Sequence, residues 1–238
     1  MKAKLLAAMH AASLTVATLA LGLLLFPLAG FSADRVAEGI EKSDLLTTED
    51  YIEFASINDV NIHELYFSTI LYEGTESCLM CHEDESAAVL EMGHFKWQGK
   101  SSNIAGREGA VHGKNDLLNN FCIAVPSNEA RCTQCHTGFG YKDANYNFND
   151  PANVDCLVCH DQTGTYSKGK TSAGMPDPGV DLNAVARSIA LGSEPTRKAC
   201  IGCHAKAGGG DNVKHGDLST DLIATTREFD VHMGVKGQ

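Results

Sequence analysis

The chain has 238 residues, enough for one domain or at most two small ones, and 43% of them are hydrophobic. It is acidic, because 30 Asp and Glu outnumber 19 Lys and Arg and the formal net charge is -11 at pH 7. A chain with this balance lacks the basic surface that a phosphate backbone requires, so nucleic acid is a poor candidate partner. The acidic side chains are expected to form a solvated surface.

Residues 1–33 have the features of a secretory signal. A basic start at Met1–Lys4 precedes an apolar stretch that reaches about Phe31 and ends in small residues. The apolar part is long for a signal, so a retained membrane anchor stays an alternative. Either arrangement exports the body of the chain, which is expected in the periplasm, at the cell surface or outside the cell.

Residues 34–77 form an acidic N-terminal lead-in. Thr47-Thr48-Glu49-Asp50 ahead of an apolar pair is a helix-start pattern. Residues 57–72 are richer in apolar and aromatic side chains and contain His63. Their periodicity does not decide between helix and strand.

Four copies of the motif C-x-x-C-H follow, at residues 78–82, 132–136, 156–160 and 200–204. This is the attachment motif of c-type haem. Two thiols three residues apart lie one helical turn apart, where they can bond the two vinyl-derived carbons on one haem edge, and the next residue faces the iron. A zinc site or a thioredoxin-like pair is the alternative, but neither requires histidine after every C-x-x-C.

The motifs therefore predict four covalently bound haems c with one iron each. The predicted thioether cysteines are Cys78, Cys81, Cys132, Cys135, Cys156, Cys159, Cys200 and Cys203, and the predicted proximal iron ligands are His82, His136, His160 and His204. Residues 78–238 form the predicted tetrahaem cytochrome c domain. With about one haem per fifty residues, the haems themselves should make up much of the core, and folding should depend on them.

The expected fold is mainly irregular chain with short α-helices, and no segment predicts a sheet. Residues 83–92 and 181–191 have helical patterns, the second with Asp181 as its cap and Gly192 at its end. Residues 98–120 and 163–179 are rich in loop-forming residues. Four aromatic side chains between residues 139 and 148 can cover haem faces, with ordinary loop packing as the alternative. The ninth cysteine, Cys122, is interpreted as a buried small hydrophobe.

Each iron has a sixth position, and five histidines outside the motifs and the signal can fill it. The candidate distal ligands are His63, His94, His112, His215 and His232. Met175 is the best methionine alternative, but the supply of histidine makes it unnecessary. Two histidine ligands keep the reduction potential lower than a His/Met pair does. A six-coordinate iron has no open position for a substrate, so no catalytic residue is assigned and an electron carrier is favoured over an enzyme.

Several strings between the motifs resemble the tetrathionate reductase family of octahaem c-type cytochromes. They are residues 119–129, 154–155, 161–166, 208–218 and 230–233, and the resemblance covers about residues 75–235. The chain has four motifs where that family has eight, and it stops just after His232-Met233, where the octahaem proteins continue. The resemblance therefore does not require the family's reactive haem, which carries a lysine ligand, to be present here.

A four-haem chain with these segments is also similar to the extracellular tetrahaem cytochromes of metal-reducing bacteria. That resemblance implies filaments in which one iron takes a ligand from the next subunit, hence head-to-tail self-association. His63 is the candidate bridging ligand and His232 the alternative; a further alternative is that His63 binds the first haem of its own chain.

The leading hypothesis is an electron carrier that serves redox partner proteins or an extracellular acceptor. The first alternative is a reductase of a sulfur or nitrogen oxyanion with one open haem. The second alternative is a periplasmic or membrane-anchored carrier linked to quinol oxidation, which requires the first 31 residues to be retained.

Overall fold

A computed structural model describes residues 46–115, 124–205, 210–213 and 217–235. The predicted signal, Cys122 and His215 lie outside these ranges. The chain divides into two compact units, residues 1–62 and 63–238. Within the described ranges, no helix has both the length and the apolar character needed to cross a membrane.

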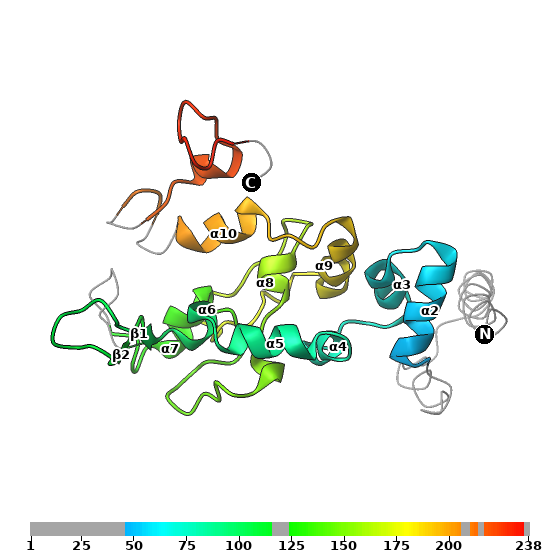
Figure 1. Cartoon of the computed structure of the whole chain (residues 1–238), viewed down its shortest axis with the longest axis horizontal. Coiled ribbons are helices and arrows are strands. Elements are labelled where there is room, and N and C mark those ends of the chain that lie inside the picture. The colour runs from blue at the N-terminus through cyan, green and yellow to red at the C-terminus, as the bar shows by residue number, and fades with distance from the viewer. Residues whose placement is uncertain (1–45, 116–123, 206–209, 214–216, 236–238) are drawn as a thin grey trace, which may run out of the picture. The chain divides into compact units, whose positions relative to one another are not determined.

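In the first unit, α2 (Thr48–Asn58) begins at the predicted capping sequence (Figure 1). The Asp50 amide donates to the Thr47 hydroxyl at 3.2 Å, and the Thr47 amide donates to the Asp50 carboxylate at 2.9 Å. These reciprocal bonds satisfy two amide groups that the first helical turn leaves free, so the predicted helix start is confirmed. The helix ends at Asp59, which has a left-handed φ of 53°.

The second unit consists of short helices joined by irregular chain. Its α-helices are α3, which begins at the unit boundary (Ile62–Thr69), α4 (Glu76–Leu79), α5 (Glu83–Leu90), α6 (Gly93–Lys96), α7 (Glu129–Cys132), α8 (Leu157–His160), α9 (Leu182–Ser188) and α10 (Arg197–His204). Short 3-10 helices are η4 (Thr133–Cys135), η5 (Pro151–Asn153), η6 (Ile189–Leu191) and η7 (Thr220–Ala224). The predicted fold class, mostly short helices and loops, is confirmed.

One short hairpin lies where only loop was expected. Strands β1 (Gly99–Lys100) and β2 (Val111–His112) pair antiparallel, with Gly99 opposite His112. Each strand has two residues, too few to show the alternating pattern by which a strand is recognised in a sequence.

The helix expected near residue 181 is present as α9 followed by η6. The Asp181 carboxylate accepts a hydrogen bond from the Ala184 amide at 2.9 Å and so caps the helix. Val185 and Ala186 are fully buried, and they pack with Phe67 and Leu157. One face of the predicted helix therefore packs against a core.

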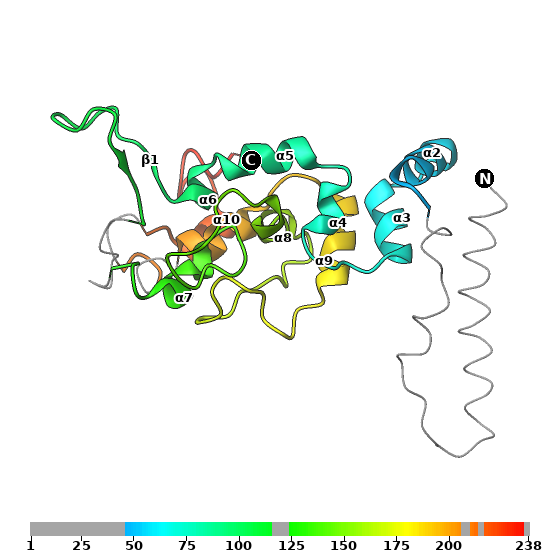
Figure 2. The ribbon, with the colours of Figure 1, turned by 90° about the horizontal axis from the view of Figure 1, so that it is seen from below.

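The described apolar residues form small separate clusters. One gathers around Leu157 in α8, a second around Trp97 and Tyr141, and a third around Ile201 in α10. In both Figure 1 and Figure 2, α8 lies in the interior of the second unit, and it packs on α9 and α10. Each cluster includes a residue of a C-x-x-C-H segment, Leu157, Cys132 or Ile201, so the third, second and fourth motifs lie against apolar clusters.

Candidate haem sites

Each C-x-x-C-H segment lies on a helical turn. The third and fourth motifs lie on α8 and α10, the second spans α7 and η4, and the first begins within α4. The amide of His82 donates to the carbonyl of Cys78 at 3.0 Å, and the amide of His160 donates to the carbonyl of Cys156 at 3.1 Å. These bonds place the two thiols of a motif one turn apart, the spacing that attachment to one haem edge needs. All eight motif cysteines are free of disulfides.

Two of the proximal histidines face a candidate distal histidine. The rings of His63 and His82 have centroids 5.9 Å apart and planes only 8° from parallel. The rings of His94 and His204 have centroids 6.1 Å apart and planes at 84°. Two imidazoles on opposite sides of one metal ion, each at a bond length of about 2 Å, have centroids about 6 Å apart. Both pairs therefore fit the two axial ligands of one iron.

The third motif presents its histidine in the form that metal ligation favours. The Nδ1 atom of His160 lies 2.8 Å from the carbonyl oxygen of Ser193. A hydrogen bond from Nδ1 to a carbonyl fixes the tautomer and leaves Nε2 free to bind a metal. In the first motif, Nδ1 of His82 faces the Glu85 carboxylate at 3.5 Å, a looser contact of the same kind.

The second motif is different, because His136 is completely buried. Its ring lies among the rings of Phe95 and Trp97 and those of Tyr141, Tyr146 and Phe148, at centroid distances from 5.1 to 6.1 Å. Burial lowers the pKa of His136 to about 4. Its Nε2 atom lies 2.5 Å from the carbonyl oxygen of Phe95, so iron ligation at this motif requires the ring to turn away from that carbonyl.

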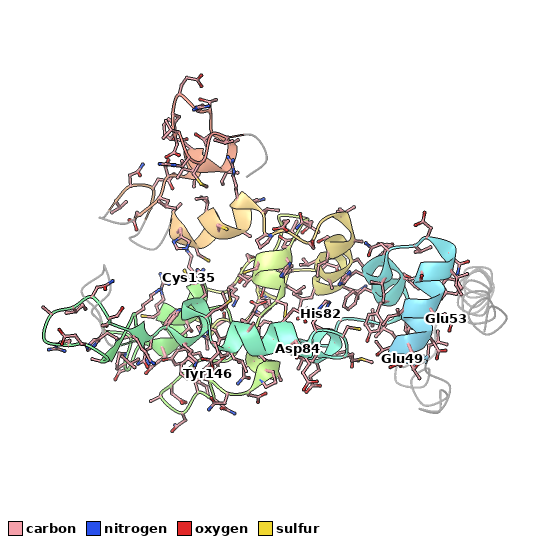
Figure 3. The ribbon with its side chains drawn as sticks, in the orientation of Figure 1. Glu49, Glu53, His82, Asp84, Cys135 and Tyr146 are labelled. Atoms are coloured by element: carbon pink, nitrogen blue, oxygen red, sulfur yellow. The ribbon has the colours of Figure 1, made fainter. Side chains whose placement is uncertain are left out.

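A cavity of about 790 Å³ lies beside the second and fourth motifs. Cys132, Cys135 and Cys203 line it, and Figure 3 shows Cys135 beside α10. Five cationic side chains also line it: Lys114, Arg131, Lys168, Lys170 and Lys198. A cavity of this size with thiols on one wall and cations around it suits a porphyrin that carries two propionates. The donor set fits haem.

Contacts between motifs link them in an order that differs from the sequence. The buried Thr75 hydroxyl, ahead of the first motif, donates to the carbonyl of Val154, ahead of the third. The sulfur atoms of Cys78 in the first motif and Cys156 in the third are neighbours. The third and fourth motifs adjoin because α8 packs on α10 and the thiols of Cys159 and Cys200 interact electrostatically.

The fourth motif in turn adjoins the second, because Cys203 and Cys135 line the same cavity and their sulfur atoms are neighbours. The spatial order of the motifs is therefore first, third, fourth, second.

The remaining candidate ligands are not paired with a proximal histidine in the part of the chain that the structure describes. His112 lies in β2 with its Nε2 3.5 Å from the Arg107 guanidinium. His232 is exposed near the C-terminal end of the described chain, and Met175 is 45% exposed. His215 lies outside the described residues. The sixth ligands of the second and third motifs stay predictions.

The chain consists of short helices and loops with four helical C-x-x-C-H turns, and two of the motif histidines lie near a second histidine. These features define a multihaem c-type cytochrome with covalently bound haem c. Comparison with known proteins supports this class. A family model described as cytochrome c554 and c-prime matches residues 77–161. The protein therefore transfers electrons or carries out another redox reaction.

Two relatives extend the similarity. The crystal structure of an octahaem cytochrome c from Shewanella oneidensis has 36% sequence identity and a TM-score of 0.63, over 74% of this chain and 38% of that chain. An uncharacterized protein of Archaeoglobus fulgidus is 25% identical over 209 residues, which cover 68% of this chain and 69% of the relative. The chain thus spans much less than two thirds of the octahaem protein's length.

One group of buried residues was not singled out from the sequence. Lys168 and Asp155 form an ion pair between the second and third motifs, and Tyr166 donates a hydrogen bond to it. Asp155 and Tyr166 fall within the strings that resemble the octahaem family, but Lys168 lies in a stretch that was interpreted as loop. No spacing rule joins a lysine to an aspartate thirteen residues away, so only the fold reveals the pair.

Proposed function

We propose that this protein is an electron carrier that passes single electrons along four low-spin haems. The observation that supports it best is the continuous series of contacts through the first, third, fourth and second motifs. Adjacent attachment sites bring adjacent redox centres near each other, which stepwise electron transfer requires. Each haem supplies a one-electron Fe(III)/Fe(II) couple when bound.

The chain's own residues hold and orient these groups. His63 with His82 and His94 with His204 would each supply two imidazole nitrogens to one iron, and two histidine ligands would keep that haem low in potential. The hydrogen bond of His160 with Ser193 fixes one ring orientation. Leu157 of the third motif is fully buried and packs with Val185, which anchors this motif on α9. No group here needs to bind a substrate.

The test is removal of the central link. A Cys156→Ala, Cys159→Ala variant should retain at most three haems by intact mass, fold poorly, and be digested faster by protease, because the third motif contacts both the first and the fourth. Cys122→Ala is the matched control, since this cysteine lies outside every motif, and it should retain four haems. A central variant of normal yield, stability and electron-transfer rate would contradict the relay.

A second candidate function is reduction of a sulfur or nitrogen oxyanion at the haem of the second motif. It is favoured by the cationic cavity there and by the lack of a histidine paired with His136 among the described residues. The ferric protein then gives a high-spin signal from one haem, and that haem binds cyanide or sulfite. Uniformly low-spin spectra that cyanide leaves unchanged would eliminate this candidate.

We also propose export, with redox partner proteins or an extracellular acceptor as the destination of the electrons. Self-association head to tail is part of this proposal. The pairing of His63 with His82 supports the alternative in which His63 serves its own chain, so the exposed His232 becomes the candidate bridging ligand. Electron microscopy of the secreted protein and of His232→Ala tests this: filaments in both samples would exclude His232, and single particles in both would exclude the filament.

A further inference from the structure

The ion pair of Lys168 and Asp155 is fully enclosed. The Lys168 amino group lies 2.6 Å from the Asp155 carboxylate, and the two side chains are 3% and 0% exposed. Lys168 also donates to the carbonyl of His136 at 2.6 Å and to that of Gly138 at 3.2 Å. Asp155 accepts from the Tyr166 hydroxyl at 2.6 Å and from the Val158 amide at 3.1 Å. Both charged groups therefore have several hydrogen-bond partners.

Stability of the fold alone does not require a buried ion pair at this position. Burying two charges costs several kcal/mol for each ion, roughly, and an apolar pair of the same volume often stabilises a protein equally well. The pair is also positioned by the motifs themselves. Asp155 directly precedes Cys156 of the third motif, and Lys168 is held by the carbonyl of His136, which ends the second. The positive and negative ends of the pair therefore have fixed positions relative to the attachment sites.

We propose that this ion pair sets a gradient of reduction potential along the relay. Lys168 raises the potentials of the haems of the second and fourth motifs, and Asp155 lowers those of the first and third.

The physical basis is the charge that reduction adds. One electron makes a haem more negative, so a nearby cation favours the reduced form and a nearby anion favours the oxidised form. Both effects are strong in a buried site, where little water screens them. Because the motifs follow each other in space as first, third, fourth and second, the gradient runs downhill for electrons from the first motif to the second.

The positions of the two charged groups show which motifs each one adjoins. Lys168 donates a hydrogen bond to the carbonyl of His136, the last residue of the second motif, at 2.6 Å. It also lines the same cavity as Cys135 of the second motif and Cys203 of the fourth. Lys168 thus adjoins the second and fourth motifs.

The carboxylate adjoins the other two motifs. Asp155 directly precedes Cys156 of the third motif and accepts a hydrogen bond from the Val158 amide within that motif at 3.1 Å. The carbonyl of Val154, one residue earlier, accepts a hydrogen bond from the Thr75 hydroxyl ahead of the first motif. Asp155 thus adjoins the third and first motifs.

The two histidine pairs provide the means of measurement. Nearly parallel axial rings, as in the first motif, and nearly perpendicular ones, as in the fourth, give low-spin ferric haems with different g-value anisotropy. A redox titration followed by electron paramagnetic resonance then reports the two potentials separately. The first-motif signal reports a potential that Asp155 should lower, and the fourth-motif signal reports one that Lys168 should raise.

The experiment compares holoprotein carrying Lys168→Met, Asp155→Asn or both. Lys168→Met should lower the potential of the fourth-motif signal, and Asp155→Asn should raise that of the first. We expect a change of about tenfold in the equilibrium constant for reduction, which is about 59 mV for a one-electron couple. Lys100→Met is the matched control, because this exposed lysine does not line the cavity and should leave both potentials unchanged.

The double variant removes both charges together, so it leaves no unpaired buried ion if a single variant fails to fold. It should bring the two potentials closer together. Unchanged potentials, or equal shifts of both signals in one direction, would overturn the gradient. This inference rests on the proposed relay, so intact mass is measured first: fewer than four haems in the unmodified protein would refute the relay, whereas four haems with unchanged potentials would refute only the gradient.

Discussion

The first and second motifs share one pentapeptide pattern but have opposite surroundings. The side chain of His82 is 46% exposed and faces His63 of the same chain, whereas His136 is completely buried within aromatic rings. Figure 3 shows His82 at the junction of α4 and α5, near the acidic Asp84. It also labels Tyr146, one of the rings around His136. The motif therefore fixes where a haem is attached, and the flanking sequence decides its exposure and axial partner.

The difference follows from what comes after each histidine. Helix α5 begins directly after His82 with three acidic residues, which stay in solvent and keep the ring at the surface. After His136 comes a linker whose rings at Tyr141 and Tyr146 stack with centroids 4.7 Å apart. These rings enclose the histidine. They contact the predicted iron ligand, so their contact with a haem face stays a prediction.

The largest expected effect on stability comes from removing the largest fully buried side chain at the second motif, which tests whether its buried surroundings stabilise the protein. Phe95→Ala should cost about 3–5 kcal/mol of unfolding free energy, because it leaves a cavity against His136, Tyr146 and Phe148. Denaturant unfolding followed by circular dichroism measures this. Phe229→Ala is the control: Phe229 is 62% exposed, and an equal loss there would show that the second motif has no special role in stability.

A smaller effect is expected from adding one carbon atom at the same site. A Cβ at Gly138 would lie 2.6 Å from the Tyr146 hydroxyl, 2.8 Å from the Asn153 carbonyl oxygen and 2.8 Å from the His136 ring. Gly138→Ala should therefore destabilise by about 1–3 kcal/mol, measured by the same unfolding experiment. Gly179→Ala, where a Cβ meets open space, should be nearly neutral; similar results for the two variants would contradict the close packing.

The first motif should respond in its spectrum more than in its stability. His63→Ala removes a half-buried ring, so it should destabilise less than Phe95→Ala, but it should convert one low-spin haem to high spin because His82 loses its partner. Electron paramagnetic resonance checks the loss of the parallel-ring signal. His112→Ala should leave that signal in place. If His63→Ala leaves it too, His63 is not the ligand of this iron.

Local features were predicted well from the sequence. The cap of α2, the helix α5 and the capped α9 depend on residues within a few positions of each other, and propensity and spacing are sufficient for such elements. The C-x-x-C-H turns belong to the same class. The helix-or-strand question for residues 57–72 is answered by the end of α2 and by α3.

Pairings across the chain were beyond the sequence. It supplied five candidate distal histidines and named a haem within the chain only for His63, as an alternative, because pairs such as His94 and His204 are brought together only by the fold. The buried Lys168–Asp155 pair has the same character. Its interaction depends on three carbonyl and carboxylate acceptors converging on one amino group, and no local pattern encodes that convergence.

The spatial order of the motifs has a consequence for how the protein is made. A chain that emerges from its N-terminus presents the first and second motifs before the other two, and these are the two ends of the contact series. The segments that join the ends, α8 and α10, arrive last. A chain that stops before Thr196 would thus lack the fourth motif, which joins Cys159 to Cys135 in the contact series seen among the described residues.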